Sequence, residues 1–238
     1  MNDLVSAGSA EAVGGGDSDT AVVGDACAVD RRIGILALQG GVAEHVAILN
    51  GIGAQPVLVR RAAQLDDIDA IVLPGGESST IDRLLRIFEL AEPLAARIRG
   101  GLPALGTCAG LVLLASRIED PAPGQQSLAI LDIAVRRNAF GSQVASEEAI
   151  VEMSDGPVQA AFIRAPVVTE VGAGVEVIAR HRGEVVAVRS GAVTGISFHP
   201  ELAGDATLHR HLVDLATGPR QAGGVDDKWQ AAATGRAR

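Results

Sequence analysis

Residues 33–59 read IGILALQGGVAEHVAILNGIGAQPVLV, and their pattern of apolar residues indicates the class of fold. It begins with a continuous apolar run at residues 33–38, which is typical of a parallel strand buried on both faces. After a glycine break, apolar residues recur at helical spacing from Val42 to Ile52. A second apolar run follows at residues 56–59. A strand, a helix and a strand in this order predict a parallel sheet covered by helices.

The same alternation continues toward the middle of the chain. We expect strands at residues 70–73 and 103–106 and three helices. The first helix places Ile81, Leu84, Leu85 and Phe88 on one face, and the other two cover residues 92–99 and 111–115. Ser78 or Ser79 is the expected cap of the first of these helices. The pattern predicts an α/β fold with a mostly parallel, doubly wound sheet and flanking helices, and ligands at the carboxyl ends of its strands.

The second half of the chain has a different pattern, which predicts an antiparallel β extension. Strand-like runs follow one another at residues 130–135, 149–153, 160–163, 175–179, 184–189 and 193–198. Arg182-Gly183 and Ser190-Gly191 are the expected hairpin turns. A closing helix over residues 205–216 should be capped by Asp205 and ended by Gly218.

Composition excludes several classes of protein. The net charge of −9 and an aromatic content of 2% argue against a nucleic-acid partner, because phosphate contacts need basic residues and bases stack on aromatic rings. No apolar run approaches the ~20 residues of a membrane span, so we expect no membrane association. Two cysteines make no disulfide framework, which favours a reduced, cytoplasmic location.

The two ends of the chain do not share the patterns of the middle. Residues 1–30 carry six acidic residues and no basic one, which fits neither a secretory signal nor a transit peptide. We expect a flexible acidic tail at residues 1–30, a single domain at residues 31–218 and a flexible tail at residues 219–238. Cys27 and Trp229, in these tails, are expected to be idle.

The sequence Gly106-Thr107-Cys108-Ala109-Gly110 lies between a predicted strand and a predicted helix. Small residues on both sides of Cys108 allow a sharp turn that would present the thiol at the sheet edge, and the positive end of the helix would favour the thiolate. A buried cysteine that acts as a small hydrophobic residue is the alternative, and position alone does not separate the two.

Two other segments follow predicted strands. In Phe198-His199-Pro200-Glu201, His199 could exchange a proton with a thiol and Glu201 could orient the imidazole, although a surface turn of this composition is the simpler interpretation. In residues 74–80, PGGESST, the glycines could form an oxyanion hole, cradle phosphate or make a tight turn. The segment lacks the lysine of a P-loop, which disfavours nucleotide binding.

Together these motifs resemble the class I, triad-type glutamine amidotransferases, which have a flavodoxin-like fold. Four further segments narrow the resemblance to the PdxT/SNO family, the glutaminase subunits of pyridoxal 5′-phosphate synthase, over residues 33–216. These segments are Leu38-Gln39-Gly40 with Glu44-His45, then residues 137–141 (RNAFG), residues 162–166 (FIRAP), and Ser197-Phe198.

The resemblance implies hydrolysis of L-glutamine to glutamate and ammonia, with the ammonia passed to a (β/α)₈-barrel synthase subunit of the PdxS/SNZ type. It assigns Cys108 as nucleophile, His199 as general base and acid, and Glu201 as its orienter. The implied glutamine-binding residues are Gly76, Glu77, Ser78, Arg137, Ile163 and Arg164. The backbone N–H groups of Gly76 and Ala109 are the candidates for the oxyanion hole.

Several points stay open at this level. Arg137 or Arg164 could meet the substrate carboxylate, stiffen nearby loops or be a solvated surface charge. The other histidines (His45, His181, His209, His211) show no metal-ligand spacing, and we expect His209 and His211 to be solvated and neither metal nor cofactor to be bound. The alternative functions are a glutaminase serving another synthase and a catalytically silent regulatory subunit.

Overall fold

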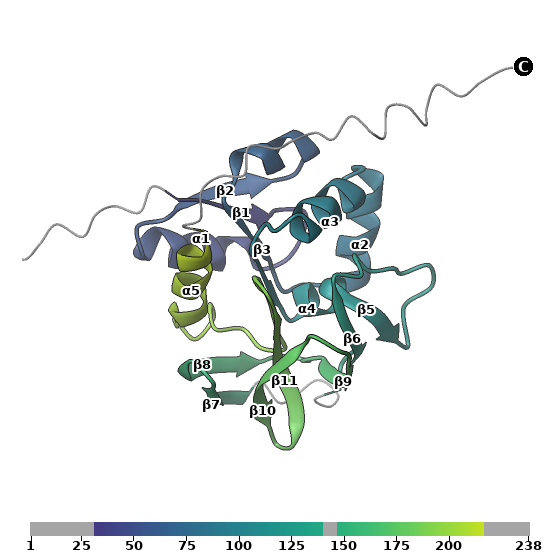
Figure 1. Ribbon diagram of the computed structural model, residues 1–238, viewed down its shortest axis with the longest axis vertical. Coiled ribbons are helices and arrows are strands. Elements are labelled where there is room, and N and C mark those ends of the chain that lie inside the picture. The colour runs from purple at the N-terminus through teal and green to yellow at the C-terminus, as the bar shows by residue number, and fades with distance from the viewer. Residues whose placement is uncertain (1–30, 140–146, 217–238) are drawn as a thin grey trace, which may run out of the picture.

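Five parallel strands form the centre of the sheet in the order β2-β1-β3-β4-β12. The structure, a computed structural model, describes residues 31–139 and 147–216 (Figure 1). The strands are β1 (Arg32–Leu36), β2 (Gln55–Val59), β3 (Ala70–Leu73), β4 (Ala104–Thr107) and β12 (Val193–Ile196). The chain extends from β1 to one side with β2 and to the other with β3, so the doubly wound sheet is confirmed.

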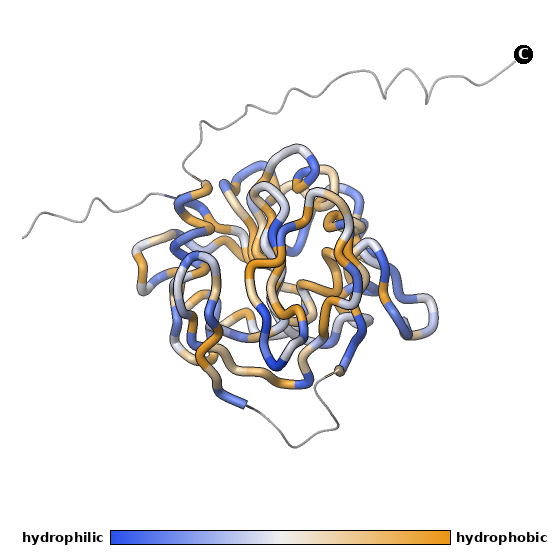
Figure 2. Tube along the Cα trace, turned by 60° about the horizontal axis from the view of Figure 1, so that its bottom comes forward, coloured by the Kyte–Doolittle hydropathy of each residue, from blue (hydrophilic) through white to orange (hydrophobic). Residues whose placement is uncertain are grey.

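Helices cover both faces of these strands. The first face carries α1 (Val42–Gly51) and α5 (Thr207–Leu215); the second carries α2 (Ser78–Ile87), α3 (Ala91–Arg99) and α4 (Ala109–Leu114) (Figure 1). Alternate strand residues serve the two faces, so that Val72 packs in one apolar core and Ile71 and Leu73 in the other. Because these strands are covered on both faces, their sequences are continuously apolar, and apolar segments run through the middle of the trace (Figure 2).

The antiparallel extension continues the same sheet beyond β12. It runs through β11 (Glu184–Ser190), β10 (Glu176–His181), β7 (Glu147–Met153) and β8 (Gly156–Phe162). β10 pairs antiparallel with β11, and β11 with β12, which confirms the two predicted hairpins. At both turns the glycine has a positive φ, 83° at Gly183 and 53° at Gly191.

Three elements escaped the sequence pattern. These are β5 (Ala115–Glu119), β9 (Val167–Val171) and a short 3₁₀ helix, η1 (Ala62–Asp67). Both strands pair with the predicted strand β6 (Leu131–Arg136). β5 follows α4 without any turn residue, so the sequence shows no break there. Its pairing with β6 is a contact that local patterning does not encode.

Several predicted helix ends were wrong. Glu77, and not Ser78 or Ser79, caps α2, and its carboxylate accepts from the N–H groups of Ser79 and Thr80 in the first turn. α2 ends at Ile87, so Phe88 lies past the helix and is 53% exposed. The cap position of α5 is Ala206, although Asp205 accepts from the N–H of Thr207.

Some predictions cannot be compared with the structure. The two tails with Cys27 and Trp229, the end of the RNAFG segment and Gly218 all lie outside the described residues. Within residues 31–139 and 147–216, no helix combines the length and apolar character needed to cross a bilayer.

The first turn of α4, directly after β4, requires a glycine at position 110. A Cβ atom at Gly110 would lie 2.0 Å from the carbonyl oxygen of Leu73, at the end of the neighbouring strand β3. Because that oxygen belongs to the backbone of a buried strand, it cannot move aside cheaply.

We therefore expect Gly110→Ala to lower the free energy of unfolding by at least about 2 kcal/mol, as overpacking in a core does. The matched control is Gly51→Ala at the end of α1, where a Cβ meets nothing within 4 Å and we expect equal or slightly higher stability. Urea unfolding of both variants measures this, and equal stability of the two would contradict the packing argument.

Candidate active site

Cys108 sits at a strained turn between β4 and α4. Its φ of 49° and ψ of −100° are unusual for a residue with a side chain, and it is the N-cap of α4. The Cys108 N–H donates to the carbonyl of Ile196 at the end of β12, at 2.8 Å, which ties the turn to the neighbouring strand. The structure therefore gives Cys108 the geometry of a nucleophile elbow, as the small residues around it predict.

His199 follows β12 by three residues and is held from a different strand. Its N–H and carbonyl form a two-way bridge with Ala161 near the end of β8, at 2.9 and 3.2 Å. Its Nδ1 lies 2.7 Å from Oε1 of Glu201, and both side chains are buried. The carboxylate thus fixes the orientation of the imidazole, and the Nε2 of the ring is left for the thiol side of the site.

The charge state of His199 depends on its two partners. Burial by itself lowers the pKa of this imidazole, but hydrogen bonding and charge from Cys108 and Glu201 outweigh burial and raise the pKa to about 10. At neutral pH His199 is therefore an imidazolium that lies between the Cys108 sulfur and the Glu201 carboxylate.

The turn after β3 fits closely against His199. A Cβ at Gly75 would lie 2.1 Å from Cε1 of the imidazole, so only glycine leaves room for the ring. A Cβ at Gly40 would lie 1.9 Å from the carbonyl oxygen of Gly75, whose carbonyl also accepts from the N–H of Gly41 at 3.0 Å. The two glycine-rich turns after β1 and β3 are therefore packed backbone against backbone.

Glu77 and Arg137 form a linked pair at one side of the site. Glu77 caps α2, and an Arg137 guanidinium nitrogen lies 2.9 Å from its Oε1. Arg137 also donates to Gln125 Oε1 at 2.6 Å. Partial burial would raise the pKa of Glu77, but hydrogen bonds from Ser79 and Thr80 lower it to about 2, so the carboxylate stays charged. Of the roles left open for Arg137, the contacts support the stiffening of nearby segments.

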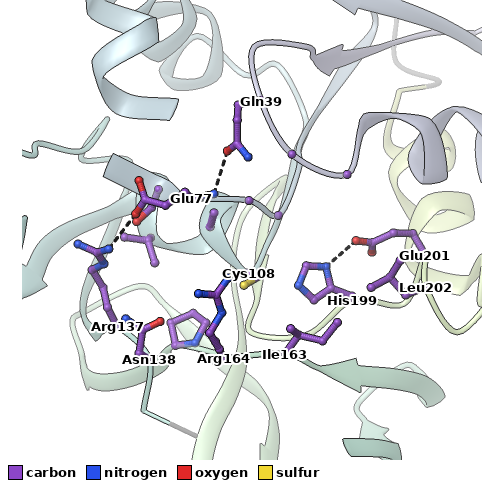
Figure 3. Close-up of a pocket in the computed structure, with 18 of the residues that line it drawn as sticks. Gln39, Glu77, Cys108, Arg137, Asn138, Ile163, Arg164, His199, Glu201 and Leu202 are labelled. Atoms are coloured by element: carbon purple, nitrogen blue, oxygen red, sulfur yellow. Dashed lines mark hydrogen bonds and ion pairs between the residues drawn. The ribbon is translucent and has the colours of Figure 1, made fainter. Parts of the chain in front are cut away.

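One pocket of about 440 Å³ brings the predicted site residues together (Figure 3). All ten line it: Gly76, Glu77, Ser78, Cys108, Ala109, Arg137, Ile163, Arg164, His199 and Glu201. The Arg164 side chain extends toward Cys108 in Figure 3. Among the described residues, none forms a hydrogen bond or ion pair with its guanidinium, in contrast to Arg137.

The prediction that His209 is solvated was wrong. His209 and His45 are both 0% exposed, and His45 Nδ1 lies 2.8 Å from His209 Nε2. His45 Nε2 lies 3.5 Å from Glu201 Oε1, so the pair adjoins the site. Helical spacing in the sequence could have indicated this burial, because His209 precedes the apolar residues Leu212 and Val213 by three and four positions, which places all three on one helix face.

In the described parts of the chain, no group of three or more His, Cys, Asp or Glu is arranged to hold a metal ion. The groups that are present can perform nucleophilic acyl chemistry. A thiol, an imidazole and a carboxylate lie in one chain of contacts, and backbone N–H groups at Gly76 and Ala109 border the same pocket.

Comparison with known proteins gives a consistent result. Residues 35–216 match the SNO glutamine amidotransferase family. Two curated relatives are each named pyridoxal 5′-phosphate synthase subunit PdxT: that of Acidothermus cellulolyticus is 54% identical, covering 77% of this chain and 93% of that protein, and that of Mycobacterium tuberculosis is 53% identical, covering 78% and 96%.

Solved structures resemble the fold. A crystal structure titled glutamine amidotransferase superposes with a TM-score of 0.73 at 43% identity, covering 77% of this chain and 98% of that one. The structure of PurLQS from Thermotoga maritima gives a TM-score of 0.58 at 18% identity, covering 78% of this chain and 98% of that one, which shows a shared fold.

The buried histidine pair predicts a specific acid sensitivity. Burial lowers the pKa of His209 to about 4, against an attraction to Asp205 that raises it. Burial, with repulsion from His209 and His199, also holds the pKa of His45 well below its usual value. Below pH 6.5 the unfolded chain therefore binds protons that the folded chain does not, so stability falls as pH falls from 6.5 toward 4.

When the pH falls from 7.5 to 5, the free energy of unfolding should decrease in the natural chain. We expect that decrease to be about 2 kcal/mol smaller in His209→Gln. Urea unfolding at the two pH values measures the difference, with His211→Gln on the same helix as the control. Parallel losses in the natural chain and His209→Gln would show that His209 is charged when folded.

Proposed function

Because the chain belongs to the SNO glutamine amidotransferase family, we propose that it hydrolyses L-glutamine to glutamate and ammonia as the glutaminase subunit of a pyridoxal 5′-phosphate synthase. The observation that carries the assignment of residues is the pocket that unites Cys108, His199 and Glu201 with both glycine-rich turns. The partner is a synthase subunit, and a (β/α)₈ barrel of the PdxS/SNZ type is the form that we propose for it.

The reaction begins with attack of the Cys108 sulfur on the side-chain carbonyl carbon of glutamine. The negative charge that develops on the carbonyl oxygen is stabilised by the N–H groups of Gly76 and Ala109. His199 then gives its proton to the leaving amide nitrogen, the C–N bond breaks, and ammonia leaves a thioester on Cys108. A water molecule gives a proton to neutral His199 while its oxygen adds to the thioester carbon. The C–S bond then breaks, glutamate departs, and Cys108 thiolate and His199 imidazolium are restored.

Glu201 acts through His199 and does not contact the substrate. Its Oε1, 2.7 Å from Nδ1, selects the tautomer whose Nε2 faces the sulfur and stabilises the imidazolium during the reaction. Burial excludes water from this contact, which strengthens it.

Arg137 and Arg164 have different surroundings, which support a different role for each. Arg137 is engaged by Glu77 and Gln125, so it supports the wall of the pocket. Arg164 extends into the pocket, and a guanidinium there is suited to a bidentate contact with the α-carboxylate of glutamine. Ile163, Ser78 and Glu77 border the same space.

We expect Cys108→Ala to lower ammonia release by at least about 10⁴-fold, because the covalent route is lost. The assay is glutamate formation by the full chain mixed with the synthase subunit, and the control is Cys27→Ser. Binding to the synthase subunit, followed by sedimentation, should be unchanged. Undiminished turnover in Cys108→Ala would refute the mechanism.

We expect Arg164→Ala to lower kcat/KM for glutamine by about 10- to 100-fold, chiefly through KM, as loss of a charged hydrogen-bonding partner does. The control is Arg83→Ala, an exposed arginine on α2 away from the pocket. An unchanged KM in Arg164→Ala, measured by steady-state kinetics with the synthase subunit, would remove Arg164 from the substrate site.

A further inference from the structure

Two buried histidines, His45 and His209, adjoin the Glu201 carboxylate, and the proposed mechanism uses neither of them. His45 comes from α1 and His209 from α5, the two helices on the same face of the sheet. Their rings are 5.1 Å apart between centroids, and neither is exposed. From the sulfur outward, the order of groups is Cys108, His199, Glu201, His45, His209.

The distances restrict where the protons lie. His45 Nδ1 and His209 Nε2 are 2.8 Å apart, so one of the two carries the shared proton. His45 Nε2 faces Glu201 Oε1 at 3.5 Å and the Thr107 hydroxyl oxygen at 3.4 Å. His209 Nδ1 is buried, and no partner for it exists among the described residues.

Only one arrangement of neutral tautomers avoids a conflict. If His209 holds its proton on Nε2, it donates to His45 Nδ1, and its unpartnered Nδ1 is a lone pair. His45 then has its proton on Nε2, the nitrogen that lies 3.5 Å from Glu201 Oε1 and 3.4 Å from the Thr107 hydroxyl oxygen. The opposite arrangement would bury an N–H with no described acceptor at His209 and turn a lone pair of His45 toward a negative charge, and both are costly.

We propose that His45 and His209 are positioning residues for Glu201, with His209 setting the His45 tautomer and His45 holding Oε1, the same carboxylate oxygen that His199 contacts. The inference rests on the proposed function, because Glu201 matters through His199. Among the described residues, Oε2 of Glu201 has no hydrogen-bond partner. The orientation of the carboxylate therefore depends on the contacts that His199 and His45 make with Oε1.

The surrounding charges support neutral rings at both positions. The groups that face the pair are Glu201 and His199 from the segment after β12, Asp205 before α5, and Thr107 at the end of β4. Cationic His199 repels a proton on His45, and burial disfavours charge on either ring.

The first test is independent of enzymatic activity. In the full chain labelled with ¹⁵N-histidine, two-bond correlation spectra at pH 7.5 should show neutral rings with the proton on Nε2 at both positions. His45→Gln and His209→Gln assign the signals. A proton on Nδ1 of either ring, or a cationic ring, would overturn the proposal. Because this result needs no turnover, it stands apart from any failure of the glutaminase assignment.

The second test is a matched pair of amides at position 45. The Gln side-chain amide reaches the place of Nε2 and can donate there, whereas the shorter Asn amide cannot. In glutamine turnover with the synthase subunit present, we expect His45→Asn to lower kcat about 10- to 100-fold at unchanged KM, as loss of a charged hydrogen bond does, and His45→Gln to restore most of it.

Controls separate positioning from packing. Thermal unfolding should rank the two amide variants as similarly stable, and His211→Asn on α5 should leave kcat unchanged. If His45→Gln and His45→Asn are equally slow, or both are as fast as the natural chain, the pair acts by packing alone and the proposal fails. If the natural chain itself does not hydrolyse glutamine with the synthase subunit, the proposed function fails and the tautomer result still decides the geometry.

Discussion

The parallel register between β4 and β12 is the constraint on which the site depends. Thr107 pairs with Ile196, so the two strands end side by side although they lie far apart in the sequence. One hydrogen bond, from the Cys108 N–H to Ile196, carries the register past the end of β4. A slip of one residue would turn Cys108 to the opposite face of the sheet and away from the imidazole, because successive side chains in a strand alternate. The register of the two strands therefore places Cys108 and the segment that carries His199 at the same edge of the sheet.

Close packing of backbone turns is the second requirement. The turns after β1 and β3 and the start of α4 pack closely at Gly40, Gly75 and Gly110, where a methyl group would overlap a carbonyl oxygen or the His199 ring. This crowding holds the strained backbone of Cys108, with its φ of 49°, since a single residue in that conformation needs surroundings that leave it no alternative. The glycines that look like loop residues in the sequence are thus part of the packed interior.

The three buried histidines have opposite pKa shifts because their neighbours differ. His199 lies between a sulfur and a carboxylate, and its pKa is raised; His45 and His209 lie farther from the sulfur, and their pKa values are lowered. One residue type therefore supplies a cation beside the Cys108 sulfur and neutral rings farther from it, according to the neighbours that the fold provides. Glu201 is the negative charge that both sets share.

The alternation of strands and helices, the hairpin turns and the three segments that line the pocket could all be predicted from the amino-acid sequence. Those signals are local: apolar runs of strand length, helical spacing and glycines at breaks. Three features became visible in the folded molecule alone: Glu77 caps a helix and binds Arg137, β5 leaves α4 to pair with β6, and His45 contacts His209. Each of these depends on a partner distant in the chain, and helical spacing can place a histidine on an apolar face without identifying the group that it meets there. Pairing, burial and charge are properties of contacts, and contacts between distant residues exist only once the sheet has brought its strands together.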